Sequence, residues 1–144
     1  MKRFLIVDDD ADDREMFCEA LQDSLTDSIC YTAPNGRRAI AALDSGEIGI
    51  PDLIFLDINM PMMNGWQCLS RLKQTESYKD IPVIIYSTSS YPEDLEKSQH
   101  GGALCFFTKP SNFQQLKSSL AIVADHVNTG SLKSLTESSA LFIK

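Results

Sequence analysis

Five polar residues stand directly after short apolar runs, and together they suit the transfer of a phosphoryl group. Asp8 and Asp9 follow the first run, Asp57 follows a second, and Ser87 and Lys109 end two others. An aspartate held beside a divalent cation and a lysine can act as a nucleophile toward phosphorus. A hydroxyl and an ammonium nearby would balance the phosphoryl oxygens, because this chemistry depends mainly on positioning and charge neutralisation.

The carboxylates of Asp8, Asp9 and Asp57 also predict a site for Mg²⁺. Three such groups repel one another when they are packed together, so a cation is needed between them. Mg²⁺ prefers hard oxygen ligands and typically takes one or two carboxylates while keeping several waters. We interpret the acidic residues that follow differently, as a helix first turn favourable to the helix dipole. These residues are Asp10, Asp12 and Asp13.

The elements that must position these residues alternate along the chain. Short apolar or β-branched runs predict strands at 4–7, 29–33, 53–56, 83–86 and 104–107. Apolar residues at helical spacing predict helices over 10–25, 37–43, 66–72, 92–99 and 112–127. This alternation is typical of a parallel sheet with helices on both faces, a doubly wound (βα)5 α/β sandwich. The carboxyl ends of the strands then meet at one rim, where ligands bind in such sheets.

The length of 144 residues suits one compact domain, which we place at residues 1–127. The tail over 128–144 is rich in serine and ends in an apolar group of residues. The sequence leaves two alternatives open for this tail, a flexible end or a short extra helix.

Charge and composition exclude several classes of partner. A net charge of −7 argues against nucleic acid, which needs clustered Lys and Arg. No apolar stretch approaches the roughly 20 residues that cross a bilayer, and the N-terminus does not resemble a signal peptide. We therefore expect a cytoplasmic protein without a membrane partner. The four cysteines lack metal-type spacing, and we interpret them as small buried hydrophobic residues in a reducing compartment.

Four strings in the chain resemble the receiver domain of two-component response regulators. They are FLIVDDD, PDLIFLDINMPMMNG, PVIIYSTS and FFTKP, in the order of that family and over about residues 3–127. The resemblance implies a flavodoxin-like sheet with strand order 2-1-3-4-5. It also implies a single-domain regulator, similar to chemotaxis regulators, that accepts a phosphoryl group with Mg²⁺ as its cofactor.

The same resemblance implies a role for each matching residue of the site. Asp57 would be the phosphoacceptor, and Asp8 and Asp9 the acidic pair, with Asp9 the more direct metal ligand. Asn59 would offer its backbone carbonyl to Mg²⁺. Lys109 would pair with the phosphoryl group, and the Lys109–Pro110 bond is the candidate for a cis peptide.

Ser87 and Phe106 would form the switch of such a domain. We hypothesise that phosphorylation draws Ser87 toward the phosphoryl group and lets Phe106 turn inward. The helix at 92–99, which has little apolar surface beyond Leu95, would then present a different surface together with the strand and helix that follow it. Two departures from the family pattern stand out: Thr88 replaces a small residue, and the switch aromatic is Phe106 rather than the tyrosine of some relatives. The run of hydroxyl residues at 87–90 also leaves a one-residue shift of the switch position open.

The partners implied are a sensor histidine kinase or a histidine phosphotransfer protein, and a downstream partner protein. The sequence also leaves two other functions to compare with this one. An aspartate-nucleophile phosphohydrolase usually carries a second aspartate where this chain has Asn59, so turnover of an external substrate is disfavoured. A degenerate receiver that only binds a protein is the other alternative, and the complete set of site residues argues against it.

Overall fold

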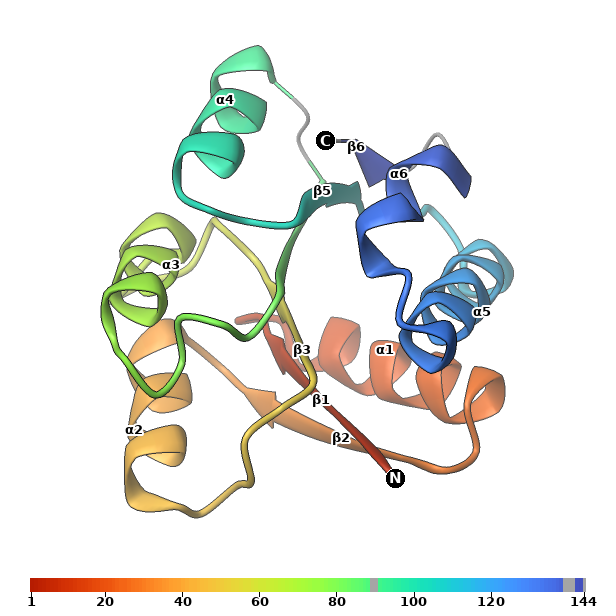
Figure 1. Cartoon of the computed structure of the whole chain (residues 1–144), viewed down its shortest axis with the longest axis horizontal. Coiled ribbons are helices and arrows are strands. Elements are labelled where there is room, and N and C mark those ends of the chain that lie inside the picture. The colour runs from red at the N-terminus through yellow and green to blue at the C-terminus, as the bar shows by residue number, and fades with distance from the viewer. Residues whose placement is uncertain (89–90, 139–141, 144) are drawn as a thin grey trace.

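In the computed structural model, strands and helices alternate along the chain and build a sheet between two layers of helices (Figure 1). The structure describes residues 1–88, 91–138 and 142–143. The strands are β1 (Lys2–Val7), β2 (Ser28–Ala33), β3 (Leu53–Leu56), β4 (Val83–Ser87), β5 (Cys105–Thr108) and β6 (Phe142–Ile143). The helices are α1 (Ala11–Ser24), α2 (Gly36–Ser45), α3 (Gly65–Gln74), α4 (Pro92–His100), α5 (Phe113–Thr129), the 3₁₀ turn η1 (Leu132–Ser134) and α6 (Leu135–Ser138).

The sheet runs in the order β2-β1-β3-β4-β5-β6, and the first five strands are parallel. The predicted doubly wound fold and its strand order 2-1-3-4-5 are therefore confirmed. The sixth strand was not predicted. It pairs antiparallel with β5, with Phe106 opposite Ile143 and Phe107 opposite Phe142. A strand of two residues shows no alternating pattern in the sequence, because alternation needs at least four residues to be recognised.

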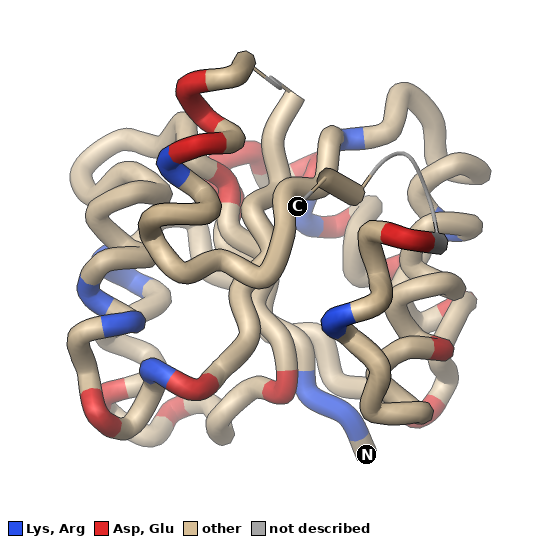
Figure 2. The backbone as a smooth tube through the Cα atoms, turned by 45° about the horizontal axis from the view of Figure 1, so that its top comes forward, with Lys and Arg blue, Asp and Glu red and all other residues tan. Residues whose placement is uncertain are grey.

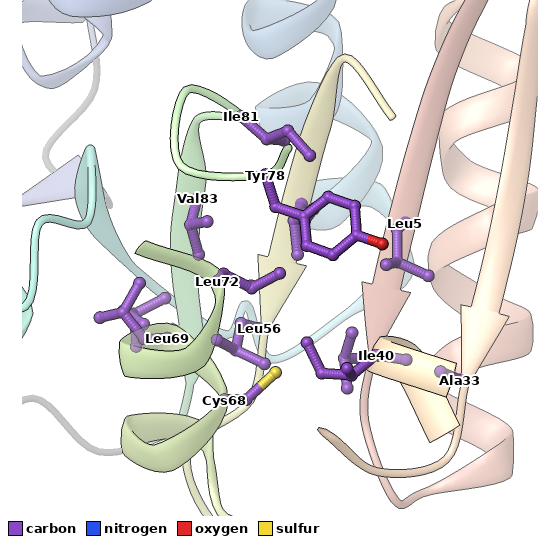
Figure 3. Close-up of a cluster of buried hydrophobic side chains, with 14 of the residues drawn as sticks. Leu5, Ala33, Ile40, Leu56, Cys68, Leu69, Leu72, Tyr78, Ile81 and Val83 are labelled. Carbon is purple, nitrogen blue, oxygen red and sulfur yellow. The ribbon is translucent and has the colours of Figure 1, made fainter. Parts of the chain in front are cut away.

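Two hydrophobic cores lie on opposite faces of the sheet, because successive strand residues point to opposite sides. In β4, for example, Val83 and Ile85 belong to one core, and Ile84 and Tyr86 belong to the other. The first core packs against α2 and α3 through residues such as those drawn in Figure 3. The second packs against α1 and α5. The strands are covered on both faces, which explains their uninterrupted apolar sequences.

A row of aromatic rings crosses the second core from α1 to the end of the chain. Phe17 lies 4.7 Å from Phe55 and 5.5 Å from Tyr86. The Tyr86 ring lies 5.3 Å from Phe107, which stacks on Phe142 at 4.4 Å. These centroid distances are typical of favourable aromatic pairs. The row connects the helix that follows the first acidic pair with the tail.

The described part of the tail packs against the rest of the domain. Residues 132–138 are helical, which agrees with a short extra helix, and Leu135 is 1% exposed in the second core. Phe142 and Ile143, from the apolar group that ends the chain, form β6 and not part of a helix. Residues 140 and 141 lie outside the described residues. Burial of Leu135 and Phe142 explains why these positions are apolar.

The cysteines divide into two pairs with different states. Cys68 and Cys105 are free and buried, as expected of small hydrophobic residues. Cys18 on α1 and Cys30 on β2 form a disulfide across 12 residues of sequence, which corrects the prediction that all four are reduced. The spacing of the two cysteines in the sequence does not reveal this pairing, since only the packing of α1 beside β2 brings their Cα atoms to 5.6 Å.

Basic and acidic residues are interspersed along the backbone seen in Figure 2. Within the described ranges, none of the helices is long and apolar enough to cross a membrane.

Candidate functional site

The ladder of the parallel sheet brings the predicted site residues to one rim. The Asp57 N–H donates to the Val7 carbonyl at 2.9 Å, which places Asp57 beside the end of β1. The Lys109 N–H donates to the Ser87 carbonyl at 2.8 Å, which joins the ends of β4 and β5 in the same way. Residues 57, 87 and 109, together with Asp8, thus follow neighbouring strands at their carboxyl ends, as the sequence predicted.

Three carboxylates converge at this rim. One oxygen from each of Asp8, Asp9 and Asp57 lies within 4.8 Å of the other two. Asp8 is fully buried and Asp57 is 6% exposed, whereas Asp9 is exposed to solvent. Oxygen donors in this number and spacing fit Mg²⁺, with the open side at Asp9 available for its waters.

Lys109 reaches into the same cluster with a side chain that is 10% exposed. Its ammonium Nζ lies 2.7 Å from Asp8 Oδ2, 3.2 Å from Asp13 Oδ2 and 3.6 Å from Asp57 Oδ2. The same nitrogen lies 5.1 Å from the centroid of the Tyr86 ring, a distance suited to a cation–π contact. The lysine therefore stands where it can neutralise part of the acidic cluster.

Burial and neighbouring charges shift the pKa of both central groups upward. Burial raises the pKa of Asp57 from 3.8 to about 6, against the lowering effects of Lys109 and the Asn59 N–H, while Asp8 and Asp9 raise it further. Burial by itself would lower the pKa of Lys109. The hydrogen bond that Lys109 donates to Asp8 and the charges of Asp57 and Asp8 outweigh burial and raise this pKa instead. At neutral pH both groups are therefore mainly charged.

The loop after Asp57 holds the backbone close to it. The Asn59 N–H donates to Asp57 Oδ1 at 3.2 Å, and the exposed side chain of Asn59 faces away from the core. Gly65 begins α3, and a Cβ at this position would lie 2.5 Å from Ile58 Cα and would also clash with the Asp57 carbonyl. Asn64 is the N-cap of α3 and forms a capping box with Gln67.

Ser87 and Thr88, two of the four hydroxyl residues at 87–90, differ in their exposure to solvent. Ser87 ends β4 and is fully buried, whereas Thr88 is exposed, so the serine is the hydroxyl that faces the interior. Residues 89–90 lie outside the described residues.

Phe106, the predicted switch aromatic, lies inward in this structure. Its side chain is 1% exposed in the first core, where Ile143 of β6 pairs with it. The Phe106 ring is therefore already in the inward position that the hypothesised switch would bring it to on phosphorylation. The Lys109–Pro110 bond is trans rather than cis, the form that X–Pro bonds favour by about 0.5–1 kcal/mol.

Sequence reasoning missed two residues at the site. Asp13 was interpreted as a helix-dipole residue, yet its carboxylate accepts a hydrogen bond from Lys109. Arg14 donates from Nη1 to the Asp8 carbonyl at 2.7 Å and fastens the start of α1 to the end of β1. The signal in the sequence was their position in the first helical turn after Asp8 and Asp9. A turn that follows the end of β1 so closely must lie beside the carboxyl ends of the strands.

Comparison with known proteins extends over most of the chain. Residues 4–121 match the family model of the response regulator receiver domain. The response regulator Rcp1 of Synechocystis sp. is 33% identical over 119 residues, covering 80% of this chain and 81% of Rcp1.

Solved structures agree with the sequence match. The phosphorylated cyanobacterial phytochrome response regulator RcpA superposes with a TM-score of 0.82 at 29% identity, covering 90% of this chain and 95% of RcpA. The Mn²⁺-bound form of response regulator Rcp1 gives a TM-score of 0.77 at 29% identity, covering 87% and 93% of the two chains. The family match, the strand order and the acidic rim with its lysine agree, and the chain belongs to the response regulator receiver domain family.

Proposed function

We propose that this receiver domain accepts a phosphoryl group on Asp57 and thereby switches a surface that a partner protein reads. The observation that carries the proposal is the position of Asp57, a nearly buried carboxylate that lies within 4.8 Å of two other carboxylate oxygens and 3.6 Å from an ammonium. A pKa of about 6 leaves Asp57 mainly ionised at neutral pH, as a nucleophile requires.

The donor proposed is the phosphohistidine of a sensor histidine kinase or of a histidine phosphotransfer protein. The Asp57 carboxylate oxygen forms the new bond to phosphorus while the bond from phosphorus to the histidine nitrogen breaks. Lys109 pairs with one phosphoryl oxygen, and the Ser87 hydroxyl donates to another. Ser87 ends β4, the neighbour of β3, and Lys109 follows β5, the next strand in the sheet. Little rearrangement of the backbone is therefore needed to bring both residues to a phosphoryl group on Asp57.

We propose that Mg²⁺ is held by Asp8, Asp9, Asp57 and the Asn59 carbonyl. The donor set fits a hard divalent cation, as its three carboxylate oxygens show. The bound ion would neutralise charge on the phosphoryl oxygens during transfer. The relative Rcp1 binds Mn²⁺ in one of its structures, which supports a divalent cation here.

The output proposed is a change in the surface of α4, β5 and α5, read by a downstream partner. α4 buries little apolar surface, with Ser98 as its one buried residue among the described positions, and such elements move at low cost. In this chain the C-terminal strand β6 lies against β5, so the surface includes the tail. We propose that the receiver domain spans residues 1–127. We also propose a cytoplasmic location, as expected from the sequence.

We further propose that the domain is not a turnover enzyme. Asn59 stands where an aspartate phosphohydrolase would carry its general acid, and an amide cannot deliver a proton to a leaving group. A receiver that only binds a protein is disfavoured, since Lys109 lies in one cluster with Asp8 and Asp57, with its ammonium 2.7 Å and 3.6 Å from their carboxylates.

Intact mass after incubation with acetyl phosphate and Mg²⁺ tests the acceptor. We expect one phosphoryl adduct on the wild type, which does not form when a chelator is present during the incubation and is absent from Asp57→Asn. Asp125→Asn, the same change on the exposed face of α5, is the matched control and should label normally. A folded wild type that gains no adduct, or an Asp57→Asn variant that still does, would contradict the assignment.

A further inference from the structure

The ammonium of Lys109 contacts three carboxylates, and the distances rank them. Asp8 is nearest at 2.7 Å, Asp13 follows at 3.2 Å, and Asp57 is farthest at 3.6 Å. The contacts to Asp8 and Asp13 are hydrogen bonds, whereas the contact to Asp57 is an ion pair beyond hydrogen-bond distance. Lys109 is thus held toward Asp8 and Asp13 and away from the proposed acceptor.

The first turn of α1 is fastened so that Asp13 stays in reach of this lysine. Asp10 caps the helix and accepts hydrogen bonds from the N–H groups of Asp12 at 2.9 Å and Asp13 at 3.2 Å. Arg14 donates to the Asp8 carbonyl. The helix start is therefore tied to the end of β1, the strand that supplies Asp8.

The two hydrogen-bonded partners of Lys109 differ in burial. The Asp8 side chain is fully buried, whereas that of Asp13 is 38% exposed. Separating Lys109 from Asp8 would leave a buried charge unpaired, which is strongly unfavourable. Water can replace Lys109 at Asp13, because exposed ion pairs are weak and screened. Asp13 is therefore the partner that the lysine can release.

We propose that Asp13 is a positioning residue that restrains Lys109 in the unphosphorylated domain and gives it up to the phosphoryl group. This inference rests on the proposed acceptor role of Asp57. A phosphoryl group there adds a charge of about −1.5 to −2, which draws the ammonium away from Asp13. By stabilising the unphosphorylated arrangement, Asp13 slows phosphorylation and lowers the affinity for anions that mimic the phosphoryl group.

Asp12 provides a matched control for the charge of Asp13. It lies on the same turn and carries the same charge, but it is not among the three carboxylates that Lys109 contacts. The variants Asp13→Asn and Asp12→Asn each remove one negative charge from nearly the same place. Any general electrostatic effect on the binding of an anionic phosphoryl donor is therefore common to both variants.

Two measurements on the full chain test the proposal. The first is the rate of Asp57 labelling by acetyl phosphate with Mg²⁺, together with the dissociation constant for beryllofluoride. We expect Asp13→Asn to increase both the rate and the affinity about three- to fivefold over Asp12→Asn, the range that a partly exposed ion pair supports. Thermal melting of both variants verifies that they are folded.

The second measurement is the ¹³Cε resonance of Lys109, which reports the position of this side chain directly. If Asp13 had a merely structural role, its replacement would leave this resonance unchanged. In the free wild type, the ¹³Cε resonance of Lys109 should differ from its position with beryllofluoride. In free Asp13→Asn it should already lie closer to that bound position, whereas in Asp12→Asn it should not. Equal rates, affinities and resonances in the two variants would overturn the positioning role while the wild type still labels at Asp57. A wild type that does not label at all would overturn the proposed function and this inference with it.

Discussion

Asp57 is subject to two opposing influences at the scale of the single residue. Burial disfavours its ionised form, and the ammonium of Lys109 favours it, with burial the larger effect. The repulsion from Asp8 and Asp9 adds to burial. A buried carboxylate of this kind costs stability when it is ionised, which is common at functional sites.

We expect Asp57→Asn to stabilise the domain at neutral pH. The folded pKa of about 6 lies above the ordinary 3.8, so the folded state binds this proton more tightly than the unfolded chain. Ionisation of Asp57 therefore destabilises the fold, by an amount that grows between about pH 4 and pH 6 and reaches up to about 3 kcal/mol above it. Asparagine cannot ionise and avoids this loss.

Urea unfolding of both proteins in EDTA, from pH 4.5 to pH 8, checks this prediction. The difference in free energy of unfolding should be largest above pH 6 and should shrink as the pH falls. Asp125→Asn should follow the wild type throughout. A difference that is constant with pH would show that the ionisation of Asp57 is not its cause.

At the scale of elements, β6 changes the edge of the sheet beside α4 and α5. Phe142 is 2% exposed and stacks on Phe107, and Leu135 lies in the same core. The tail thus belongs to the fold and extends the aromatic row that starts at Phe17. The Cys18–Cys30 disulfide fastens the other end of that row by joining α1 to β2.

We expect Phe142→Ala to lower the free energy of unfolding by about 2–3 kcal/mol. The loss should be smaller than the roughly 3–5 kcal/mol typical of a phenylalanine in a rigid core, because a terminal strand of two residues can detach. Ile143→Ala, at the half-buried neighbouring position, is the matched control and should cost less. Chemical denaturation measures both values, and an unchanged midpoint for Phe142→Ala would mean that β6 adds nothing to stability.

At the scale of the whole molecule, charge connects the site with stability. The chain carries a net charge of −7, and the fold brings three carboxylates to within 4.8 Å at one rim. Lys109 offsets only part of this charge. A divalent cation at the rim would therefore bind the folded state much more tightly than the unfolded chain, where Asp57 is far from Asp8 and Asp9.

We expect Mg²⁺ to raise the melting temperature at pH 7.5 relative to EDTA. At a concentration one hundred times its dissociation constant, the ion would add about 2.7 kcal/mol, or about 5–10 °C for a domain of this size. Asp9→Asn should lose most of this shift, and Asp12→Asn should keep it. A shift that is equal in the two variants would place the cation elsewhere.

The sequence by itself determined the architecture and most of the site. The strand at 53–56 is found with the same bounds in the structure, because an apolar run of four residues that follows Pro51 and Asp52 is long enough for a strand and too short for a helix. The convergence of Asp8, Asp57, Ser87 and Lys109 followed from the rule that the carboxyl ends of parallel strands share a rim.

Only the tertiary structure decided the features that depend on elements far apart in the sequence. The Cys18–Cys30 pair, the strand β6 and the inward position of Phe106 arise where α1 meets β2 and where the tail meets β5. Asp13 shows the same for a single side chain. Its place on a helix first turn suggested the dipole, and its contact with Lys109, 96 residues away, appears only when the helix start is packed against the end of β5. Local patterns specify local structure, whereas contacts between distant segments depend on the packing of the whole chain.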